Sequence, residues 1–492
     1  MDNDSFYDRL GLPRDATLDE IRHAYREMAR RLHPDKNVKP GETELFISVQ
    51  EAYEVLANPD QKNSYDSTLP PEQQAHLPLA MSINYSSNTL VSLPEPQLIY
   101  ALLEFKAQMA TGELPPPPLN ICLVLDCSTS MHGLRLDTVK LTAIELIRQL
   151  QANDILSVVK FSDKAEVVIP AGSYYNREEI ETHIQLLHAG GGTEIFQGLE
   201  AGYSEIIRYR AKNYINHIIL ITDGRTYGDE QECLRLVDKA AALGIGISTL
   251  GIGGKWNDSF LDMISSQTGG SSKFVSKTDD LGRFLFDKIA KLGRSYAELV
   301  TFNFQTSPGI DLNYAFRLNP EASPLTTSSP IVVGTVPRDL SQTLLLEFLV
   351  HEIPAKASRL MLAKGFLSYE IPTRTGRQSF SERLELWRPV SQELDTDLPS
   401  STFIQAISRL NLYRMQERAR LDLQEGKVEE ATQRLQSIAT HLLAQGHNEL
   451  ARSVLSEVVH IQQTQVFSED GEKRIKYGTR SLLLPAGTEE KR

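Results

Sequence analysis

Three short segments of this 492-residue chain carry side chains that could bind a divalent metal ion. The segments are Asp126-Cys127-Ser128-Thr129-Ser130, Gly190-Gly191-Gly192-Thr193 and Thr222-Asp223-Gly224. They offer carboxylates and hydroxyls, which are hard oxygen ligands of the kind that Mg²⁺ prefers. A purely structural alternative is a helix-capping cluster, because Ser, Thr and Asp are also favoured at helix N-termini.

The sequence around these segments alternates apolar runs with amphipathic stretches. The near-continuous apolar runs suit central parallel strands that are buried on both faces, and they are Ile121–Leu125, Ile155–Phe161, Ile218–Thr222 and Ile245–Leu250. Helical patterns fall between them, at Leu134–Leu150, Glu178–Leu187, Ile195–Tyr209 and Glu230–Leu243. This alternation predicts a doubly wound α/β sheet, whose ligands bind at the carboxyl ends of the strands. We therefore expect the three segments to meet at one edge of the sheet.

Asp-x-Ser-x-Ser, followed by a distant Thr and a distant Asp, resembles the metal-ion-dependent adhesion site of von Willebrand factor A (VWA) domains, over about residues 119–293. The resemblance implies a site for Mg²⁺, or another divalent cation such as Mn²⁺, formed by Asp126, Ser128, Ser130, Thr193 and Asp223. Thr129 stands where relatives commonly have glycine. This difference removes none of the five ligands. Three of the ligands are neutral hydroxyls, so the cation stays electrophilic. We hypothesise that an Asp or Glu of a partner protein completes its coordination shell.

The first region of the chain is predicted to form two amphipathic helices. Apolar residues at helical spacing form one stripe with Ile21, Tyr25, Met28 and Leu32 and a second with Phe46, Val49, Tyr53 and Leu56. Two antiparallel helices can bury these stripes against each other. The opposite face of the first helix is basic and carries Arg22, Arg26 and Arg30.

Several motifs of this region resemble the J domain of DnaJ in their order and spacing, over about residues 4–68. They are Tyr7-Asp8, Leu10-Gly11-Leu12, His33-Pro34-Asp35, Glu51-Ala52-Tyr53-Glu54-Val55-Leu56 and Tyr65-Asp66. The resemblance implies docking on a DnaK-type chaperone and stimulation of its ATP hydrolysis. It also implies that His33, Pro34 and Asp35 form the essential loop and that the basic face with Arg22, Arg26 and Arg30 is the docking surface. Gln61-Lys62-Asn63-Ser64 departs from the family in being less basic.

The domain organisation follows from these patterns. Strand-like stretches occur both before and after the α/β region, and an isolated hairpin is rarely stable alone. We expect the earlier strands to pair with the later ones, so that the VWA domain, Rossmann-like and doubly wound, is inserted in a β-sandwich. The expected parts are a helical J domain (1–68), a linker with the first sandwich strands (69–118), the VWA domain (119–293), the remaining strands (294–395), C-terminal helical hairpins (398–465) and a polar tail (466–492).

Composition restricts the partners and the compartment. The formal net charge of −13 disfavours a nucleic-acid binder, which usually has a basic surface. The N-terminal MDNDSFYDRLG lacks the plan of a secretory signal, and no apolar run approaches the ~20 residues that span a membrane. The three cysteines show no CxxC spacing. We expect a cytoplasmic protein without an integral membrane segment, and the combination of domains resembles bacterial proteins.

Two function classes remain, and we expect neither to be enzymatic. The first is a co-chaperone adaptor, in which the VWA domain binds a partner protein and the J domain recruits a DnaK-type chaperone. The alternative is a metal-dependent adhesion or scaffolding protein whose J domain is non-functional. Against an enzyme, the sequence has no Walker A loop, nucleophile elbow or HExxH motif, and no His or Glu is obviously placed as a general base beside the metal loop.

Overall fold

The computed structural model describes residues 6, 10, 21–22, 24–26, 29, 42–58, 61–62, 65, 78–108, 116–173, 176–210, 213–226, 228–276, 280–353, 357–373, 376–393, 399–468 and 470–483. The chain divides into two compact units, Met1–Leu77 and Pro78–Arg492. Within the described residues, no helix is both long enough and apolar enough to cross a lipid bilayer.

In the first unit, Ile21 and Tyr25 of the first predicted apolar stripe meet the second stripe in one core, and Met28 and Leu32 lie outside the described residues. Helix α3 (Glu42–Leu56) supplies Val49 and Leu56, which pack with Leu10 and Ile21 from the preceding segment. The rings of Tyr25 and Tyr53 stack across the same contact, with centroids 4.0 Å apart. Burial of these side chains is the driving force for the pairing, because each removes apolar surface from water.

The second unit contains a six-stranded sheet with the order β6-β5-β4-β7-β8-β9. All neighbouring strands pair in parallel except β5 and β6, which are antiparallel. The strands are β4 (Leu119–Asp126), β5 (Ile155–Phe161), β6 (Ala165–Gly172), β7 (Ile215–Thr222), β8 (Gly246–Ile252) and β9 (Ser272–Val275). Every residue of the central strands β4 and β7 is buried, as their continuous apolar sequences predicted.

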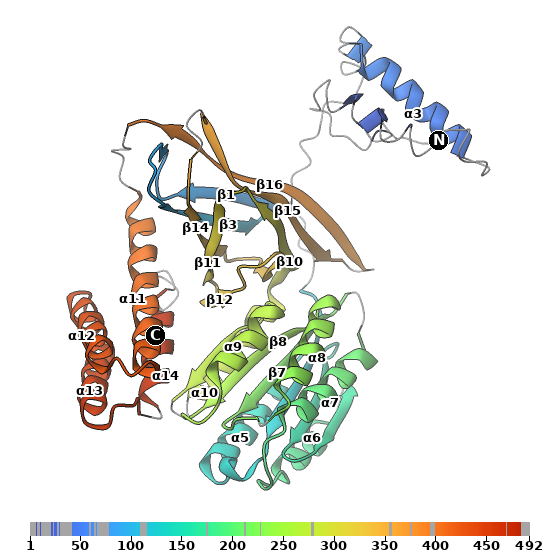
Figure 1. Ribbon diagram of the computed structural model, residues 1–492. Helices are drawn as coiled ribbons and strands as arrows, with labels where there is room; N and C mark the ends of the chain where they lie inside the picture. The colour runs from blue at the N-terminus through green and yellow to red at the C-terminus, as the bar shows by residue number, and fades with distance from the viewer. Residues whose placement is uncertain are drawn as a thin grey trace. The chain divides into compact units, whose positions relative to one another are not determined.

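Helices cover both faces of this sheet (Figure 1). One face carries α5 (Leu134–Gln149), α6 (Arg177–Gln185) and α10 (Asp280–Gly293). The other face carries α7 (Ile195–Arg208), α8 (Glu230–Ala242) and α9 (Asp258–Gln267). The short 3₁₀ helix η1 (Thr129–Met131) follows β4. The doubly wound α/β domain predicted from the sequence is confirmed.

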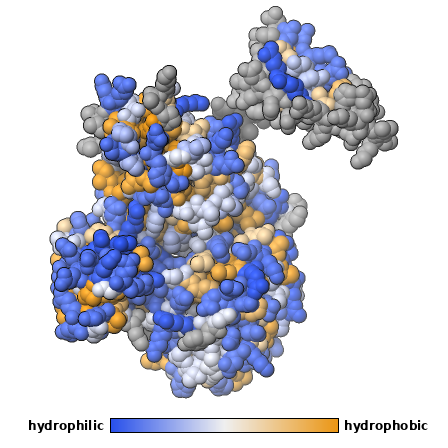
Figure 2. All heavy atoms as spheres, in the orientation of Figure 1, coloured by the Kyte–Doolittle hydropathy of each residue, from blue (hydrophilic) through white to orange (hydrophobic). Residues whose placement is uncertain are grey.

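Two five-stranded sheets form a β-sandwich around a second apolar core. The first sheet has the order β1-β3-β14-β11-β12, with β1 (Leu79–Tyr85), β3 (Gln97–Ala107), β14 (Gln342–Val350), β11 (Ile310–Asn319) and β12 (Ser323–Leu325). The second has the order β13-β10-β15-β16-β2, with β13 (Ile331–Pro337), β10 (Ser295–Thr306), β15 (Arg359–Pro372), β16 (Arg377–Ser391) and β2 (Leu90–Val91). Figure 2 shows apolar residues gathered in places over this sandwich.

The α/β domain is an insertion between two parts of the sandwich. Strand β3, which precedes it, pairs with β14, which follows it, over nine residues from Gln342↔Phe105 to Val350↔Gln97. Strand β2 likewise pairs with the end of β16. The predicted fold class is therefore confirmed, although the sequence did not indicate β1, β11 or β12.

Four helices complete the second unit: α11 (Ser401–Gln424), α12 (Val428–Ala444), α13 (Asn448–Thr464) and α14 (Gly471–Ser481). Helix α11 packs on the sandwich, where Phe403 and Tyr413 share a buried cluster with Phe316. The expectation of a polar tail after residue 465 is wrong for α14, which buries Ile475 and Tyr477. The charged residues of α14 led to the prediction of a polar tail, because the carboxylates that neutralise Lys476 and Arg480 lie far away in the sequence.

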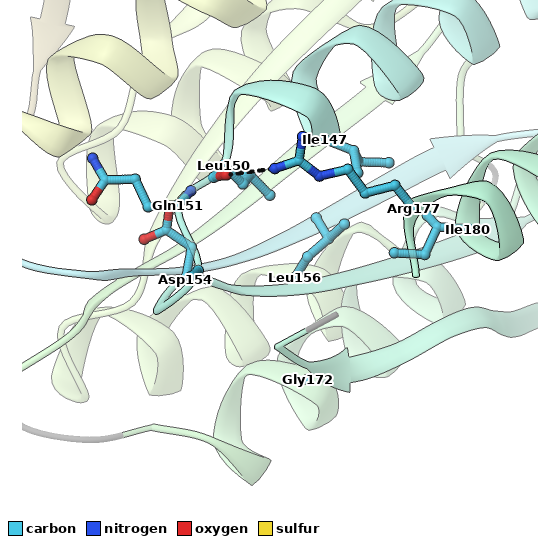
Figure 3. A pocket seen from close by; sticks show the side chains of 9 residues that line it. Ile147, Leu150, Gln151, Asp154, Leu156, Gly172, Arg177 and Ile180 are labelled. Atoms are coloured by element: carbon cyan, nitrogen blue, oxygen red, sulfur yellow. Dashed lines mark hydrogen bonds between the residues drawn. The ribbon is translucent and has the colours of Figure 1, made fainter. Parts of the chain in front are cut away.

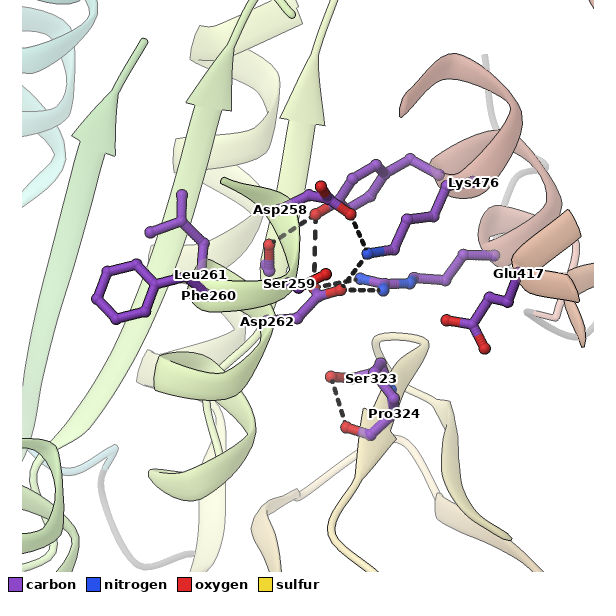
Figure 4. A network of polar contacts seen from close by, with 12 residues as sticks. Asp258, Ser259, Phe260, Leu261, Asp262, Ser323, Pro324, Glu417 and Lys476 are labelled. Atoms are coloured by element: carbon purple, nitrogen blue, oxygen red, sulfur yellow. Dashed lines mark hydrogen bonds and ion pairs between the residues drawn. The ribbon is translucent and has the colours of Figure 1, made fainter. Parts of the chain in front are cut away.

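Those distant charges form a buried ionic network between α14 and α9 (Figure 4). Arg480 donates two hydrogen bonds to Asp262, of 2.8 and 2.6 Å, and Lys476 lies 2.8 Å from the same carboxylate. Lys476 also pairs with Asp258. Burial alone would raise the pKa of Asp262, but Arg480 and Lys476 hold it well below its usual range. The network ties the C-terminal helices to the α/β domain.

We expect Asp262→Asn to lower the free energy of unfolding by about 3–5 kcal/mol, because it leaves buried cations without their counter-charge. Urea denaturation at pH 7 measures the loss. The matched control is Asp339→Asn, which removes a carboxylate from an exposed pair with Arg294 and should cost less than about 1 kcal/mol. Because the folded pKa of Asp262 is lowered, its contribution is present above about pH 4 and declines as the pH falls. Equal losses in the two variants would contradict the assignment.

Candidate metal centre

The two acidic residues of the site stand at the carboxyl ends of adjacent strands. Asp126 is the last residue of β4, and Asp223 directly follows the last residue of β7. The strands pair in parallel with Leu125 opposite Ile221, so both carboxylates reach the same edge of the sheet. In the sheet, β5 lies on one side of β4, and β7 lies on its other side. The connections from these strands therefore run in opposite directions across the sheet, which makes this edge a topological switch point.

The carboxylate of Asp126 is buried and held by two hydrogen bonds. Its Oδ1 accepts from the backbone N–H of Ser128 at 2.8 Å, and its Oδ2 accepts from the Thr222 hydroxyl at 2.6 Å. Burial raises the pKa of Asp126, while these hydrogen bonds act in the opposite direction. A buried carboxylate with a raised pKa is stabilised in its ionised form by any cation brought close to it.

The serine hydroxyls lie at spacings that suit octahedral coordination. The Oγ atoms of Ser128 and Ser130 are 3.0 Å apart, and Ser130 Oγ donates to Asp223 Oδ1 at 2.6 Å. Adjacent oxygens around a six-coordinate Mg²⁺ with bonds of about 2.1 Å lie about 3.0 Å apart. Within the described residues, no three His, Cys, Asp or Glu side chains cluster as metal ligands, so a cation at this edge depends on the hydroxyls.

The glycine-rich segment brings Thr193 to the same place. Gly191 O accepts from the backbone N–H and the hydroxyl of Thr129, at 3.0 and 2.9 Å, which ties this segment to the first loop. A Cβ added to Gly224 would lie 2.8 Å from Thr193 Oγ1, so glycine leaves the room that this hydroxyl occupies. The structure thus brings together all five residues predicted from the sequence, and their donor set fits a hard divalent cation.

Sequence reasoning missed one residue of this edge, Arg135. Its Nη1 pairs with Asp223 Oδ2 and donates to the backbone oxygen of Ser130 at 3.3 Å. Arg135 stands in the first turn of α5, where a positive charge is disfavoured by the helix dipole. That unfavourable placement was the available signal in the sequence.

A separate pocket of about 300 Å³ lies at the other end of the sheet (Figure 3). Asp154 lines it just before β5 begins, whereas the metal centre lies where β4 and β7 end. The Asp154 carboxylate accepts from the backbone N–H groups of Leu119 and Gln151, both at 2.8 Å. These bonds give Asp154 a role in joining strands and loops, apart from the metal centre.

The residues predicted to contact a chaperone belong to the first unit. Arg22 and Arg26 are exposed, whereas Ile21 is buried. Arg30, His33, Pro34 and Asp35 lie outside the described residues.

Comparison with known families assigns three parts of the chain. The DnaJ domain matches residues 5–66, the von Willebrand factor type A domain matches residues 120–287, and the Sll0103-like C-terminal alpha-helical domain matches residues 401–485. Together these matches cover the first unit, the α/β domain and the C-terminal helices.

Individual proteins match the chain over one long and one short stretch. Uncharacterized protein sll0103 of Synechocystis sp. is 28% identical over 383 residues, which cover 75% of this chain and 89% of the relative. Chaperone protein DnaJ of Streptococcus uberis is 48% identical over 66 residues, which cover 13% of this chain and 18% of the relative. The chain thus spans less than a fifth of that DnaJ.

Solved structures resemble the second unit in fold. A von Willebrand factor type A protein from Catenulispora acidiphila superimposes with a TM-score of 0.64 at 14% identity, covering 81% of this chain and 96% of that one. The ArnB paralog VWA2 from Sulfolobus acidocaldarius superimposes with a TM-score of 0.53 at 16% identity, covering 82% and 98%.

The fold and the matches define a multidomain VWA protein whose α/β domain is inserted in a β-sandwich. More particularly, this chain joins a DnaJ domain to that VWA domain, and its C-terminal helices match the Sll0103-like alpha-helical domain. The predicted resemblance to both families is confirmed.

We expect Gly224→Ala to lower the free energy of unfolding by about 1–3 kcal/mol, because its Cβ would displace the Thr193 side chain. Gly190→Ala is the matched control, since a Cβ there meets nothing within 4 Å, and it should change stability by less than about 0.5 kcal/mol. Urea denaturation with EDTA present excludes any metal effect. A Gly224→Ala protein as stable as the control would contradict the close packing of the two loops.

Proposed function

We propose that this protein is a co-chaperone adaptor. Its VWA domain binds partner proteins through a divalent-metal site, and its J domain stimulates the ATPase of a DnaK-type chaperone at that partner. One observation supports the proposal most. The same chain contains a DnaJ domain and a VWA domain, and in the VWA domain two carboxylates and three hydroxyls lie together at one edge of the sheet. DnaK-type chaperones and their substrates meet in the cytoplasm, where we place this activity, and the net charge of −13 favours protein partners over nucleic acid.

The J-domain part of the proposal rests on the DnaJ match and on the basic face. Arg22 and Arg26 are exposed, as a surface for an acidic partner requires. Arginines on one partner and carboxylates on the other accelerate encounter and are weakened by salt. His33, Pro34 and Asp35 match the family's essential tripeptide, and Arg30 continues the basic stripe.

The VWA part of the proposal rests on the geometry of the metal centre. Asp126, Ser128, Ser130, Thr193 and Asp223 would hold Mg²⁺ or Mn²⁺. A cation bound there supplies an electrophilic coordination position for a carboxylate. Thr129 and Ser130 are exposed at this edge, so the position faces a partner's Asp or Glu.

A role in binding is favoured over catalysis by the groups that touch the five side chains. Apart from the ligand carboxylates Asp126 and Asp223 themselves, the hydrogen-bond partners of these side chains are serine, threonine, arginine and backbone groups. None of those partners is a general base at neutral pH. The alternative function is a VWA scaffold whose J domain is non-functional, and it is favoured by the weakly basic Gln61-Lys62-Asn63-Ser64.

We expect Mg²⁺ at about ten times its Kd to stabilise the protein by about 1.4 kcal/mol, because it binds the folded chain only. EDTA should reverse the rise in Tm. Asp126→Asn should abolish the rise, while Asp137→Asn, an exposed carboxylate in the first turn of α5, should retain it. Thermal melts with and without Mg²⁺ measure the effect, and an unchanged rise in Asp126→Asn would contradict the assigned ligands.

We expect the full chain to stimulate the steady-state ATPase of a bacterial DnaK-type chaperone several-fold. His33→Gln should remove the stimulation, because it changes the matched tripeptide. The control is His188→Gln, an exposed histidine of the VWA domain, which should stimulate as the unmodified chain does. No stimulation by the unmodified chain would favour the scaffold alternative.

A further inference from the structure

The metal centre already contains a positive charge of its own. Arg135 pairs through Nη1 with Asp223 Oδ2, while Asp223 Oδ1 accepts from the Ser130 hydroxyl at 2.6 Å. Both oxygens of this carboxylate are therefore engaged. The Asp223 side chain is fully buried and that of Arg135 is 37% exposed, so the pair joins a buried carboxylate to a side chain that reaches solvent.

The surrounding chain leaves space for this guanidinium. Gly253, which follows β8, has a φ of +66°, and a Cβ there would lie 3.0 Å from Arg135 Nη2. The backbone oxygen of Ser130 accepts a second hydrogen bond from Nη1. Arg135 thus has one neighbour from the first metal loop, one from the end of β7 and one from the end of β8.

Helix stability does not account for a cation at this position. Arg135 lies in the first turn of α5, where unpaired backbone N–H groups and the helix dipole favour negative charge. Asp137 in the same turn follows that preference. The position of Arg135 is explained instead by its ion pair with the Asp223 carboxylate, at the end of β7.

The charges of the site give this arginine a distinct effect on ligands. Asp126 and Asp223 carry two negative charges, so a divalent cation alone makes the site neutral. With Arg135 the loaded site has a net charge of +1, and a single carboxylate from outside neutralises it. Without Arg135, the same carboxylate would leave a net charge of −1 in a partly buried site, which is unfavourable.

We propose that Arg135 is the residue that makes this site select an anionic ligand. In the metal-free site its guanidinium pairs with Asp223. When Asp223 serves as a metal ligand, the guanidinium pairs with the incoming carboxylate, for which its planar donors are well suited. Arg135 therefore opposes metal binding and favours carboxylate binding. This inference rests on the proposed metal function of the same five residues.

The test uses the full chain, with Mn²⁺ as the metal and ¹³C-acetate as the carboxylate. Electron paramagnetic resonance of free Mn²⁺ gives the metal affinity, and paramagnetic relaxation of ¹³C-acetate gives the carboxylate affinity of the loaded protein. The variants are Arg135→Met, which removes the charge, and Arg135→Lys, which keeps it. The matched control is Arg225→Met, which removes an exposed arginine close to Asp223 whose Nε donates to Lys255 O.

We expect Arg135→Met to bind Mn²⁺ about five-fold more tightly and acetate about five-fold more weakly, as for a partly exposed charge pair. Arg135→Lys should retain most of the acetate affinity, and Arg225→Met should change either affinity by less than about two-fold. The two opposite shifts distinguish a ligand-selecting role from general damage to the fold, which would weaken both affinities.

Other outcomes overturn the proposal in separable ways. If the unmodified chain binds no Mn²⁺, the proposed metal function fails and this inference fails with it. If the unmodified chain binds Mn²⁺ and Arg135→Met behaves identically, only the role of Arg135 is wrong. Loss of Mn²⁺ binding in Arg135→Met, or no relaxation of acetate on the unmodified loaded protein, would also refute it.

Discussion

Parallel pairing of β4 with β7 is the constraint on which the functional edge depends. The register that places Leu125 beside Ile221 brings Asp126 and Asp223 to one end of the sheet, although 96 residues separate them. Buried apolar side chains on both faces of these strands maintain the register, because a shifted strand would lose that burial. The serine hydroxyls and Thr193 then need only short loops to reach the same point.

Helix α14 packs against the loop that follows β8, which lies next to the metal centre. Lys473 of α14 donates to Gly254 O, and Tyr477 packs against Trp256, with ring centroids 5.8 Å apart. Gly253, on the same loop, leaves room for Arg135. The loop after β8 therefore lies between the metal centre and a helix anchored by the buried pair of Asp262 and Arg480. Helix α14 thus packs against the VWA domain, while α11 packs on the sandwich.

Much of the fold could be predicted because local patterns and final structure agree. The predicted strand Ile155–Phe161 is observed with the same bounds, and the helix predicted over Leu134–Leu150 ends within one residue of α5. Elements without a local pattern were missed. The short β12 exists because it pairs with β11, and α14 exists because Asp258 and Asp262 neutralise its lysine and arginine. Neither partner is visible from the segment itself.

The sequence by itself determined the two domain families, the five candidate metal ligands and the insertion of one domain in another. It did so because strand periodicity, glycine positions and ordered motifs are properties of short segments. Only the tertiary structure decided which charges meet. Three contacts join residues that are distant in the chain. They are the ion pair of Arg135 with Asp223, the ion pairs of Asp262 with Lys476 and Arg480, and the packing of Thr193 against Gly224. Electrostatic pairing depends on distance in space and burial, and neither can be read from separation along the sequence.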